Sequence, residues 1–231
     1  MEAWARRSHF MAYEFVDEAE YHRYRKDCAE VLKRTCMTLK HKGIGASFVL
    51  VGSGARNLVT RNGNGPFDLD YNLQILKMPQ KYDRDLRGLK ETIRNALNRA
   101  EGLKCFSDAQ DSTSCLTAIL HFEDSPQVKF SFDVAIVKKN SLGNWTRLIH
   151  NKNAFFIGTY QYTWNEVPRS SDVKEKADVL KDENHWEEVR ETYVNLKNRY
   201  LRGADKTHPS FVVYVEAVNQ VYYRHHGNVL F

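Results

Sequence analysis

Residues 65–75 read GPFDLDYNLQI, and from Asp68 onward apolar and polar side chains alternate. The apolar set is Leu69, Tyr71, Leu73 and Ile75, and the polar set is Asp68, Asp70, Asn72 and Gln74. A period of two predicts a β-strand with one buried face. Aspartate is rare in strands, and like charges side by side on one face repel each other. The presence of Asp68 and Asp70 on one face therefore needs an explanation beyond the fold.

A second alternating stretch, VKFSFDVAIV at residues 128–137, carries a third carboxylate, Asp133. Its apolar face consists of Val128, Phe130, Phe132, Val134 and Ile136, and Asp133 lies on the opposite face. Pairing of this strand with residues 68–76 brings all three aspartates to one side of a sheet. Three converging carboxylates repel one another unless a cation neutralises them. Oxygen ligands of this kind favour Mg²⁺ or Mn²⁺.

A glycine-rich turn precedes the strand that carries Asp68 and Asp70. Residues 46–54, ASFVLVGSG, predict a short buried strand that ends in Gly52, Ser53 and Gly54. Backbone N–H groups and a hydroxyl in such a turn can bind phosphate, and Arg56 can add positive charge. A tight turn of this kind is common by itself. Beside a carboxylate cluster, however, it indicates metal-assisted phosphoryl chemistry.

The rest of the chain predicts further strands with helices on either side of them. Apolar residues recur at helical spacing over residues 13–42 and again over residues 82–102. Strands are expected at 115–122 and within the stretches WTRLIH and AFFIGTYQYTW. From residue 171 the sequence predicts two helices, at 172–203 and 209–226.

This order of elements predicts an α+β fold with a mixed β-sheet core, an N-terminal helix and a C-terminal helical part. We expect the N-terminal helix to occupy residues 1–45, the core residues 46–168 and the helical part residues 169–231. The helical part is expected to pack with the core as one unit.

Composition narrows the class of protein only slightly. The chain of 231 residues has a formal net charge of +5, which permits a phosphate-bearing partner but does not require one. Its four cysteines form no CxxC pair and do not cluster with histidine, so we expect neither a zinc site built on them nor a disulfide framework. No signal peptide or apolar stretch long enough to span a membrane is present, and we expect a cytoplasmic protein.

The ordered set of motifs resembles the polymerase β nucleotidyltransferase superfamily. Members of this family have a strand that ends in Gly-Ser, a strand with two alternating aspartates and a later strand with a third aspartate. The corresponding stretches here are Val51-Gly52-Ser53, Phe67-Asp68-Leu69-Asp70-Tyr71 and Phe132-Asp133-Val134. The resemblance covers residues 45–140. Each motif is weak alone, and their order on matching elements makes the resemblance specific.

The resemblance implies a metal-dependent transfer of a nucleotidyl group from an NTP to a hydroxyl acceptor, with release of pyrophosphate. Asp68 and Asp70 would hold the Mg²⁺ or Mn²⁺ that binds the triphosphate, and Asp133 would join them on a second ion and could accept the proton of the hydroxyl. Gly52 and Ser53 would bind the β- and γ-phosphates. Arg56 and Lys197 are the expected cations, although Lys197 matches no motif and could be an ordinary surface lysine.

The resemblance does not choose the acceptor. Family members modify small molecules, extend RNA, synthesise nucleotide second messengers or modify proteins. The oligomeric state is also open. Two alternatives belong to other classes of protein: a catalytically silent nucleotide- or partner-binding module with the same fold, and a nucleic-acid-binding regulator whose binding needs no divalent metal.

Several other residues allow both a functional and a structural interpretation. The two aspartates could occupy a solvated strand face, and Asp133 a polar edge position. An aromatic run could stack a base, but packing in the core is the commoner role; its members are Phe155, Phe156, Tyr160, Tyr162 and Trp164. His208, His225 and His226 are expected to belong to a surface tail rather than to a metal site. The basic residues of the first helix are expected to form a solvated flank, balanced by glutamates; they are Arg23, Arg25, Lys26, Lys33 and Arg34.

Overall fold

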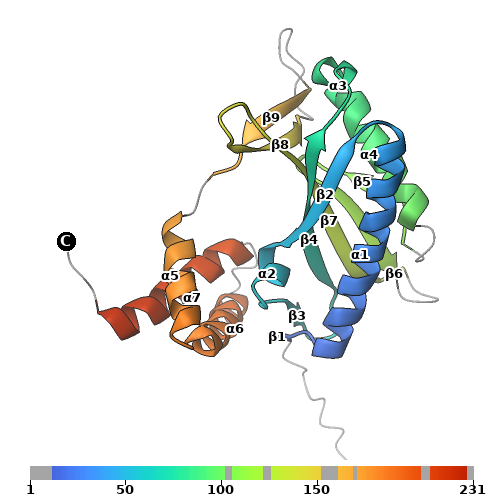
Figure 1. Cartoon of the computed structure of the whole chain (residues 1–231). Helices are drawn as coiled ribbons and strands as arrows, with labels where there is room; N and C mark the ends of the chain where they lie inside the picture. Colours follow the sequence, from blue (N-terminus) through green and yellow to red (C-terminus); the bar gives the residue numbers. More distant parts are fainter. Residues whose placement is uncertain are drawn as a thin grey trace, which may run out of the picture. The chain divides into compact units, whose positions relative to one another are not determined.

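A computed structural model describes residues 12–101, 106–121, 126–151, 161–168, 171–203 and 209–227 (Figure 1). The chain divides into two compact units. The first, here called the sheet unit, comprises Val16–Val59 and Pro66–Ser170. The second, here called the helical unit, comprises Met1–Phe15, Thr60–Gly65 and Ser171–Phe231.

A mixed β-sheet forms the centre of the sheet unit. Its strands are β2 (Gly45–Val51), β4 (Phe67–Lys77), β5 (Gln110–Asp111), β6 (Leu116–His121), β7 (Val128–Lys139), β8 (Trp145–His150) and β9 (Tyr162–Glu166). Five of them lie in the order β2-β4-β7-β6-β5, and β8 pairs with β7 and with β9. The β4–β7 pair is parallel, and the other pairs are antiparallel. This confirms the predicted α+β fold with a mixed sheet.

Two long helices, α1 (Glu18–His41) and α4 (Leu86–Glu101), pack against each other and cover one face of this sheet (Figure 1). The apolar sides of β4 and β7 face them, and Leu69, Leu73 and Phe132 are fully buried in the shared core. Tyr24 of α1 stacks on Phe130 of β7 with ring centroids 4.4 Å apart. Because side chains alternate along a strand, the polar residues of β4 and β7 lie on the opposite face.

The helix expected over residues 13–42 begins later than predicted. Residues Tyr13–Phe15 form strand β1, and α1 begins only after Asp17, whose side chain accepts a hydrogen bond of 3.0 Å from the backbone N–H of Glu20. This is the usual arrangement of a helix N-cap. The apolar spacing of the sequence did not distinguish these residues from the helix, because they pair with a distant strand.

The helix expected over residues 82–102 is divided in two. The short helix α3 (Lys81–Arg84) ends at Asp85, and α4 follows it. Asp85 leaves the helical conformation, with φ −126° and ψ 72°, and its Oδ1 accepts a hydrogen bond of 2.7 Å from the N–H of Gly88. A side chain that satisfies a free first-turn N–H in this way starts a new helix.

Within the helical unit, β1 pairs antiparallel with β3 (Thr60–Asn62), and three helices follow, α5 (Ser171–Asp182), α6 (Trp186–Arg202) and α7 (Ser210–His226). The side chain of Asn198 in α6 bonds both the N–H and the C=O of Tyr13 in β1, at 2.7 and 2.9 Å. The single helix expected over residues 172–203 is broken at Asn184, which has φ +63°. A left-handed residue of this kind ends α5 before α6 begins.

No helix in the described part of the chain is long and apolar enough to cross a membrane. Among the described residues, Cys28, Cys36 and Cys115 form no disulfide, and Cys105 lies outside those residues.

Candidate active site

Strand pairing brings the three predicted aspartates together on the face of the sheet opposite α1 and α4. In the parallel register of β4 and β7, Asp70 lies opposite Asp133 and Asp68 opposite Ser131. On its other side, Asp70 lies opposite Val51, the last residue of β2. The predicted convergence of Asp68, Asp70 and Asp133 on one side of the sheet is therefore present.

The electrostatics of this face are those of a crowded carboxylate cluster. Burial, followed by the negative charges of Asp68 and Asp133, raises the pKa of Asp70 from 3.8 to about 6. The positive charges of Arg147 and Arg56 act in the opposite direction but do not compensate. The protein therefore holds Asp70 in a position where its ionised form is unfavourable unless another positive charge is added.

The glycine-rich turn lies directly against Asp70. Gly52 has φ +62°, and a Cβ atom at this position would be 2.3 Å from Oδ2 of Asp70. Gly54 is buried, and its carbonyl accepts a hydrogen bond of 3.0 Å from the hydroxyl of Tyr21 in α1. Gly52 and Ser53 begin the short helix α2 (Gly52–Ala55) where the sequence predicts a turn. The backbone that the sequence assigns to phosphate binding is thus adjacent to the carboxylates.

Arg147 is a cation on this face that the sequence did not indicate. It lies on β8 opposite Val137, and because Val137 and Asp133 share a face of β7, Arg147 faces the same side as Asp133. Its Nε atom is buried, and no hydrogen-bond partner reaches it among the described residues. WTRLIH was interpreted only as a plausible strand. If the pairing of this strand with the end of β7 had been known, it would have shown which face of the sheet Arg147 lies on.

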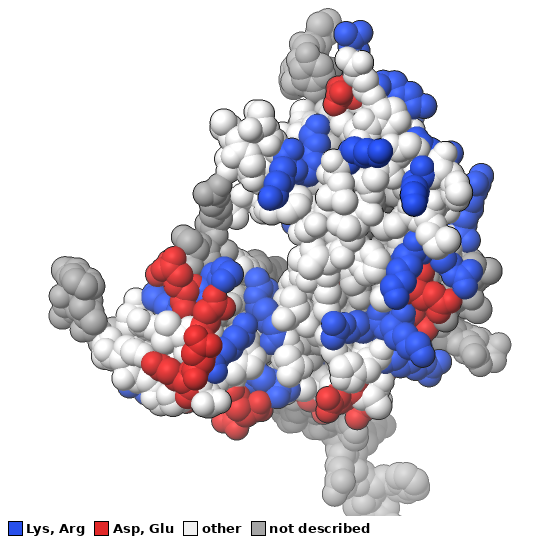
Figure 2. All heavy atoms as spheres, viewed as in Figure 1, with Lys and Arg blue, Asp and Glu red and all other residues white. Residues whose placement is uncertain are grey.

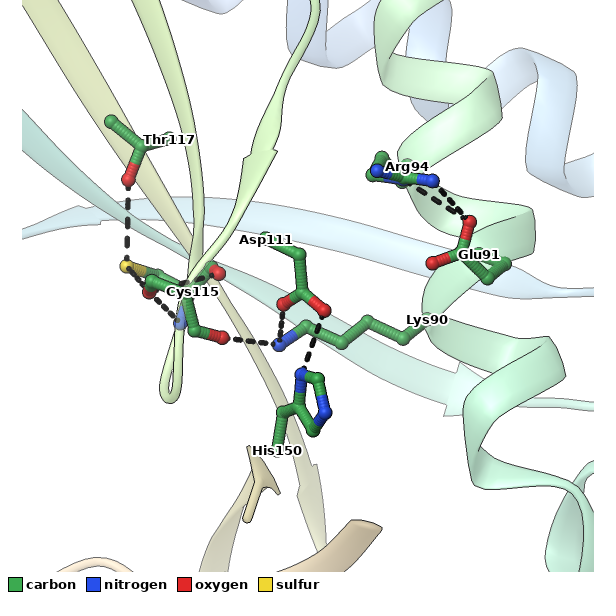
Figure 3. Close-up of polar contacts among 8 residues, drawn as sticks. Lys90, Glu91, Arg94, Asp111, Cys115, Thr117 and His150 are labelled. Atoms are coloured by element: carbon green, nitrogen blue, oxygen red, sulfur yellow. Dashed lines mark hydrogen bonds and ion pairs between the residues drawn. The ribbon is translucent and has the colours of Figure 1, made fainter. Parts of the chain in front are cut away.

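Thr117 is a second residue that the sequence did not single out. It lies opposite Asp133 in the antiparallel β6–β7 pair, and its hydroxyl donates a hydrogen bond of 2.5 Å to Asp133 Oδ1. The thiol of Cys115 lies 3.8 Å from the Thr117 hydroxyl and 3.0 Å from the hydroxyl of Ser112 (Figure 3). The carboxylate of Asp133 is therefore positioned by a hydrogen bond from the neighbouring strand β6.

A buried ion pair fixes the β5–β6 hairpin that carries Thr117. Lys90 of α4, only 1% exposed, contacts Asp111 Oδ1 at 2.5 Å and donates to the carbonyl of Ser112 at 2.8 Å. Nδ1 of His150 lies 2.9 Å from the other oxygen of Asp111 (Figure 3). A buried charge pair is costly to break, because removal of one partner leaves the other charge buried and unpaired. It holds the hairpin, and with it Thr117, in one place relative to the sheet.

We expect Thr117→Val to lower the rate of any reaction that uses Asp133 by roughly tenfold, because valine keeps the shape of threonine but cannot orient the carboxylate. Thr117→Ser retains a hydroxyl and is the matched control. The two variants should be compared by initial rate as a function of divalent-metal concentration. Equal rates for the valine and serine variants would show that the hydrogen bond does not position Asp133.

Lys197 belongs to the helical unit. Its Nζ donates hydrogen bonds to Thr60 Oγ1 at 2.9 Å and to Ser210 Oγ at 3.4 Å, and it lies 4.1 Å from the centroid of the Tyr13 ring. It therefore has defined contacts and is not a freely solvated surface lysine. Its action on a triphosphate stays a prediction.

The remaining residues singled out in the sequence are the aromatic run, three histidines and the basic residues of the first helix. Tyr162 and Trp164 pack against the core, in agreement with the structural interpretation, whereas Phe155, Phe156, Tyr160 and His208 lie outside the described residues. His225 and His226 are not in a tail, because they form the last turn of α7. Figure 2 shows acidic side chains among the basic ones over α1, where Arg34 pairs with Glu30 at 2.9 Å.

No family model and no curated protein matches the chain, but solved structures do. The Vibrio cholerae DncV cyclic AMP-GMP synthase, in complex with the linear intermediate 5′ pppA(3′,5′)pG, matches with a TM-score of 0.62 and 10% identity, over 91% of this chain and 74% of that chain. The chain has the fold of this synthase. CdnC of E. coli MS115-1, solved with ATP, matches with a TM-score of 0.52 and 15% identity, over 93% of this chain and 68% of that chain.

A third match is the Escherichia coli DncV in its 3′-deoxy GTP bound form, with a TM-score of 0.53 and 8% identity, over 89% of this chain and 68% of that chain. At such identities the likeness to DncV and CdnC concerns the fold. The roles of individual residues are argued from the geometry of this chain.

Proposed function

We propose that the chain is a metal-dependent nucleotidyltransferase that moves an NMP group from an NTP to a hydroxyl acceptor and releases pyrophosphate. The observation that carries this proposal is the register of the sheet. It sets Asp70 opposite Asp133, keeps Asp68 on the same face and brings the glycine turn against Asp70. The fold shared with DncV supports the same reaction class.

The residues present fit a divalent cation. Asp68, Asp70 and Asp133 offer only carboxylate oxygens, the ligands that Mg²⁺ and Mn²⁺ prefer. The raised pKa of Asp70 indicates a cluster that a cation would stabilise. When bound there, such ions neutralise the charges of the carboxylates and the phosphates and lower the pKa of the acceptor hydroxyl.

The protein groups then have separate tasks. Oδ1 of Asp133 is engaged by Thr117, so Oδ2 is the atom that would accept the proton of the attacking hydroxyl. Ser53 and the backbone N–H groups of the turn would bind the β- and γ-phosphates. Arg56 and Arg147, which both act on Asp70, would balance the charge that develops on the leaving pyrophosphate. Lys197 of the helical unit is the further expected cation.

We infer that the acceptor is the hydroxyl of a second nucleotide, so that the product is a linear or cyclic dinucleotide or a short oligonucleotide. The inference rests on the fold shared with a cyclic AMP-GMP synthase that was solved with a linear dinucleotide intermediate. RNA and small-molecule acceptors use the same chemistry at the same carboxylates, and the experiment below separates them.

The test is pyrophosphate release from the four α-labelled NTPs, singly and in pairs, with Mg²⁺ or Mn²⁺. Parallel reactions contain no acceptor, tRNA or bulk RNA, and the labelled products are resolved. We expect label in small nucleotide products without added acceptor, and none with Asp70→Asn. Label confined to RNA would assign an RNA acceptor. NTP binding without turnover in any reaction would favour a catalytically silent module, and no NTP binding would contradict the proposed function.

A further inference from the structure

The start of α6 and the end of α7 bring two histidines and a glutamate together in the helical unit. His185 immediately precedes α6, and Glu188 lies in its first turn, three residues later and on the same side of the helix. His225 lies in the last turn of α7, which packs against α6. None of these residues belongs to the carboxylate face of the sheet unit.

The three side chains lie within the dimensions of one metal site. Nε2 of His225 is 2.6 Å from Glu188 Oε2, and the rings of His185 and His225 are stacked with centroids 3.7 Å apart. One possible ligand atom from each residue lies within 4.8 Å of the other two. Ligand atoms around a tetrahedral Zn²⁺ lie about 3.4 Å apart, as its Zn–N and Zn–O distances require. The two rings are only 17° from parallel. Because an imidazole nitrogen binds a metal in the plane of its ring, at least one of the two rings must turn out of the stack for both to bind one ion.

The surroundings of Glu188 favour one class of metal over another. The guanidinium of Arg224 contacts Oε1 of Glu188 and leaves Oε2 on the side of His225. Arg224 also offsets the negative charge of Glu188, which disfavours Mg²⁺ or Ca²⁺, because these ions depend on carboxylate charge. Two imidazoles and one carboxylate are instead a ligand set that Zn²⁺ and neighbouring transition metals bind.

We propose that His185, Glu188 and His225 bind Zn²⁺ or a transition metal of similar preference, with water in the fourth position. His225 binds through the lone pair of Nε2, which replaces its present contact with Glu188, and its ring proton then lies on Nδ1. The ion links the first turn of α6 to the last turn of α7. This site is separate from the residues that we propose for nucleotidyl transfer. A negative result for metal binding here would therefore leave the proposed function unchanged.

The test uses the full chain without a polyhistidine tag, stripped of metal with a chelator and then dialysed. Co²⁺ is titrated while its visible absorption is followed, and Zn²⁺ affinity is measured by competition with a chromophoric chelator. All proteins carry Asp70→Asn, which weakens metal binding at the carboxylate face. We expect one equivalent of Co²⁺ with the absorption of a four-coordinate site, displaced by one equivalent of Zn²⁺.

In this background, His185→Ala and His225→Ala should each weaken Zn²⁺ binding by roughly 100-fold or more. Loss of a residue that only supports a metal ligand already lowers metal affinity by about tenfold to 100-fold, and loss of the ligand itself should cost at least as much. His226→Ala is the matched control, since His226 is the next residue of the same turn but contacts Glu183 at 3.1 Å instead. Glu188→Gln provides a second test if an alanine variant fails to fold by circular dichroism. Absence of binding by the folded parent, or equal loss with His226→Ala, would overturn the proposal.

Discussion

Asp70→Asn is expected to abolish nucleotidyl transfer while making the metal-free protein more stable at pH 7. Asparagine has nearly the shape of aspartate but no charge. It therefore removes a metal ligand, the cost of burying a carboxylate and the repulsion from Asp68 and Asp133. Loss of several kcal/mol of charge stabilisation in the transition state corresponds to about three powers of ten in rate. A purely structural aspartate would show the opposite pattern, with lost stability and retained activity.

The gain in stability should depend on pH in a defined direction. The pKa of Asp70 is about 6 in the folded protein, compared with an ordinary value of 3.8. Below pH 3.8 the carboxyl is protonated in both the folded and the unfolded state, so it contributes no penalty. Between pH 3.8 and 6 the unfolded state ionises more readily, and the wild type loses stability as the pH rises. Above pH 6 the penalty is complete.

The difference between the two pKa values corresponds to roughly 3 kcal/mol. Asp70 is only half-buried, and asparagine remains a polar group there, so we expect a gain of about 1–2 kcal/mol at pH 7. Urea unfolding at pH 3.5 and pH 7 with a chelator present measures the free energy of unfolding at each pH. Asp83→Asn, at an exposed position on α3, is the control that should show little change. A gain that is equal at both pH values would show that the unfavourable ionisation of Asp70, through burial and the charges of Asp68 and Asp133, is not its cause.

The sequence alone indicated those features of the site that depend on alternation within a single strand. The period of two in β4 and β7 was sufficient to place Asp68, Asp70 and Asp133 on polar faces. The glycine turn was recognisable because Gly52 and Gly54 follow a short apolar strand. These are local patterns, and the parallel register of β4 and β7 then brought the predicted residues together.

Thr117 and Arg147 were missed for the opposite reason. Each of them has a place in the site only through the strand opposite it, since Thr117 pairs with Asp133 and Arg147 with Val137. A threonine and an arginine in a strand carry no signal until that pairing is known. The helix breaks at Asp85 and Asn184 were missed because a single residue decides each of them. At Asp85 a side-chain hydrogen bond to Gly88 starts a second helix, and at Asn184 a left-handed backbone conformation ends one. Neither changes the apolar spacing of the sequence around it.

Gly52→Ala is expected to reduce activity far more than it reduces stability. An alanine at φ +62° is strained by about 1–2 kcal/mol, and its Cβ atom would lie 2.3 Å from Asp70 Oδ2. The carboxylate is the end of a short side chain and can rotate away, so the additional loss of stability is small. The rotation, however, moves Asp70 out of the position in which it faces Asp133. A displacement of about 1 Å in a catalytic group can cost roughly 100-fold in rate.

Gly143→Ala separates the strain of the backbone from the displacement of Asp70. Gly143 also has a positive φ, +80°, but nothing lies within 4 Å of the place where its Cβ atom would be. Both variants should therefore lose a similar free energy of unfolding, whereas only Gly52→Ala should lose roughly 100-fold in pyrophosphate release. If Gly52→Ala retained activity within about twofold of Gly143→Ala, Asp70 would not need its present orientation, and the placement of the turn against it would have no catalytic role.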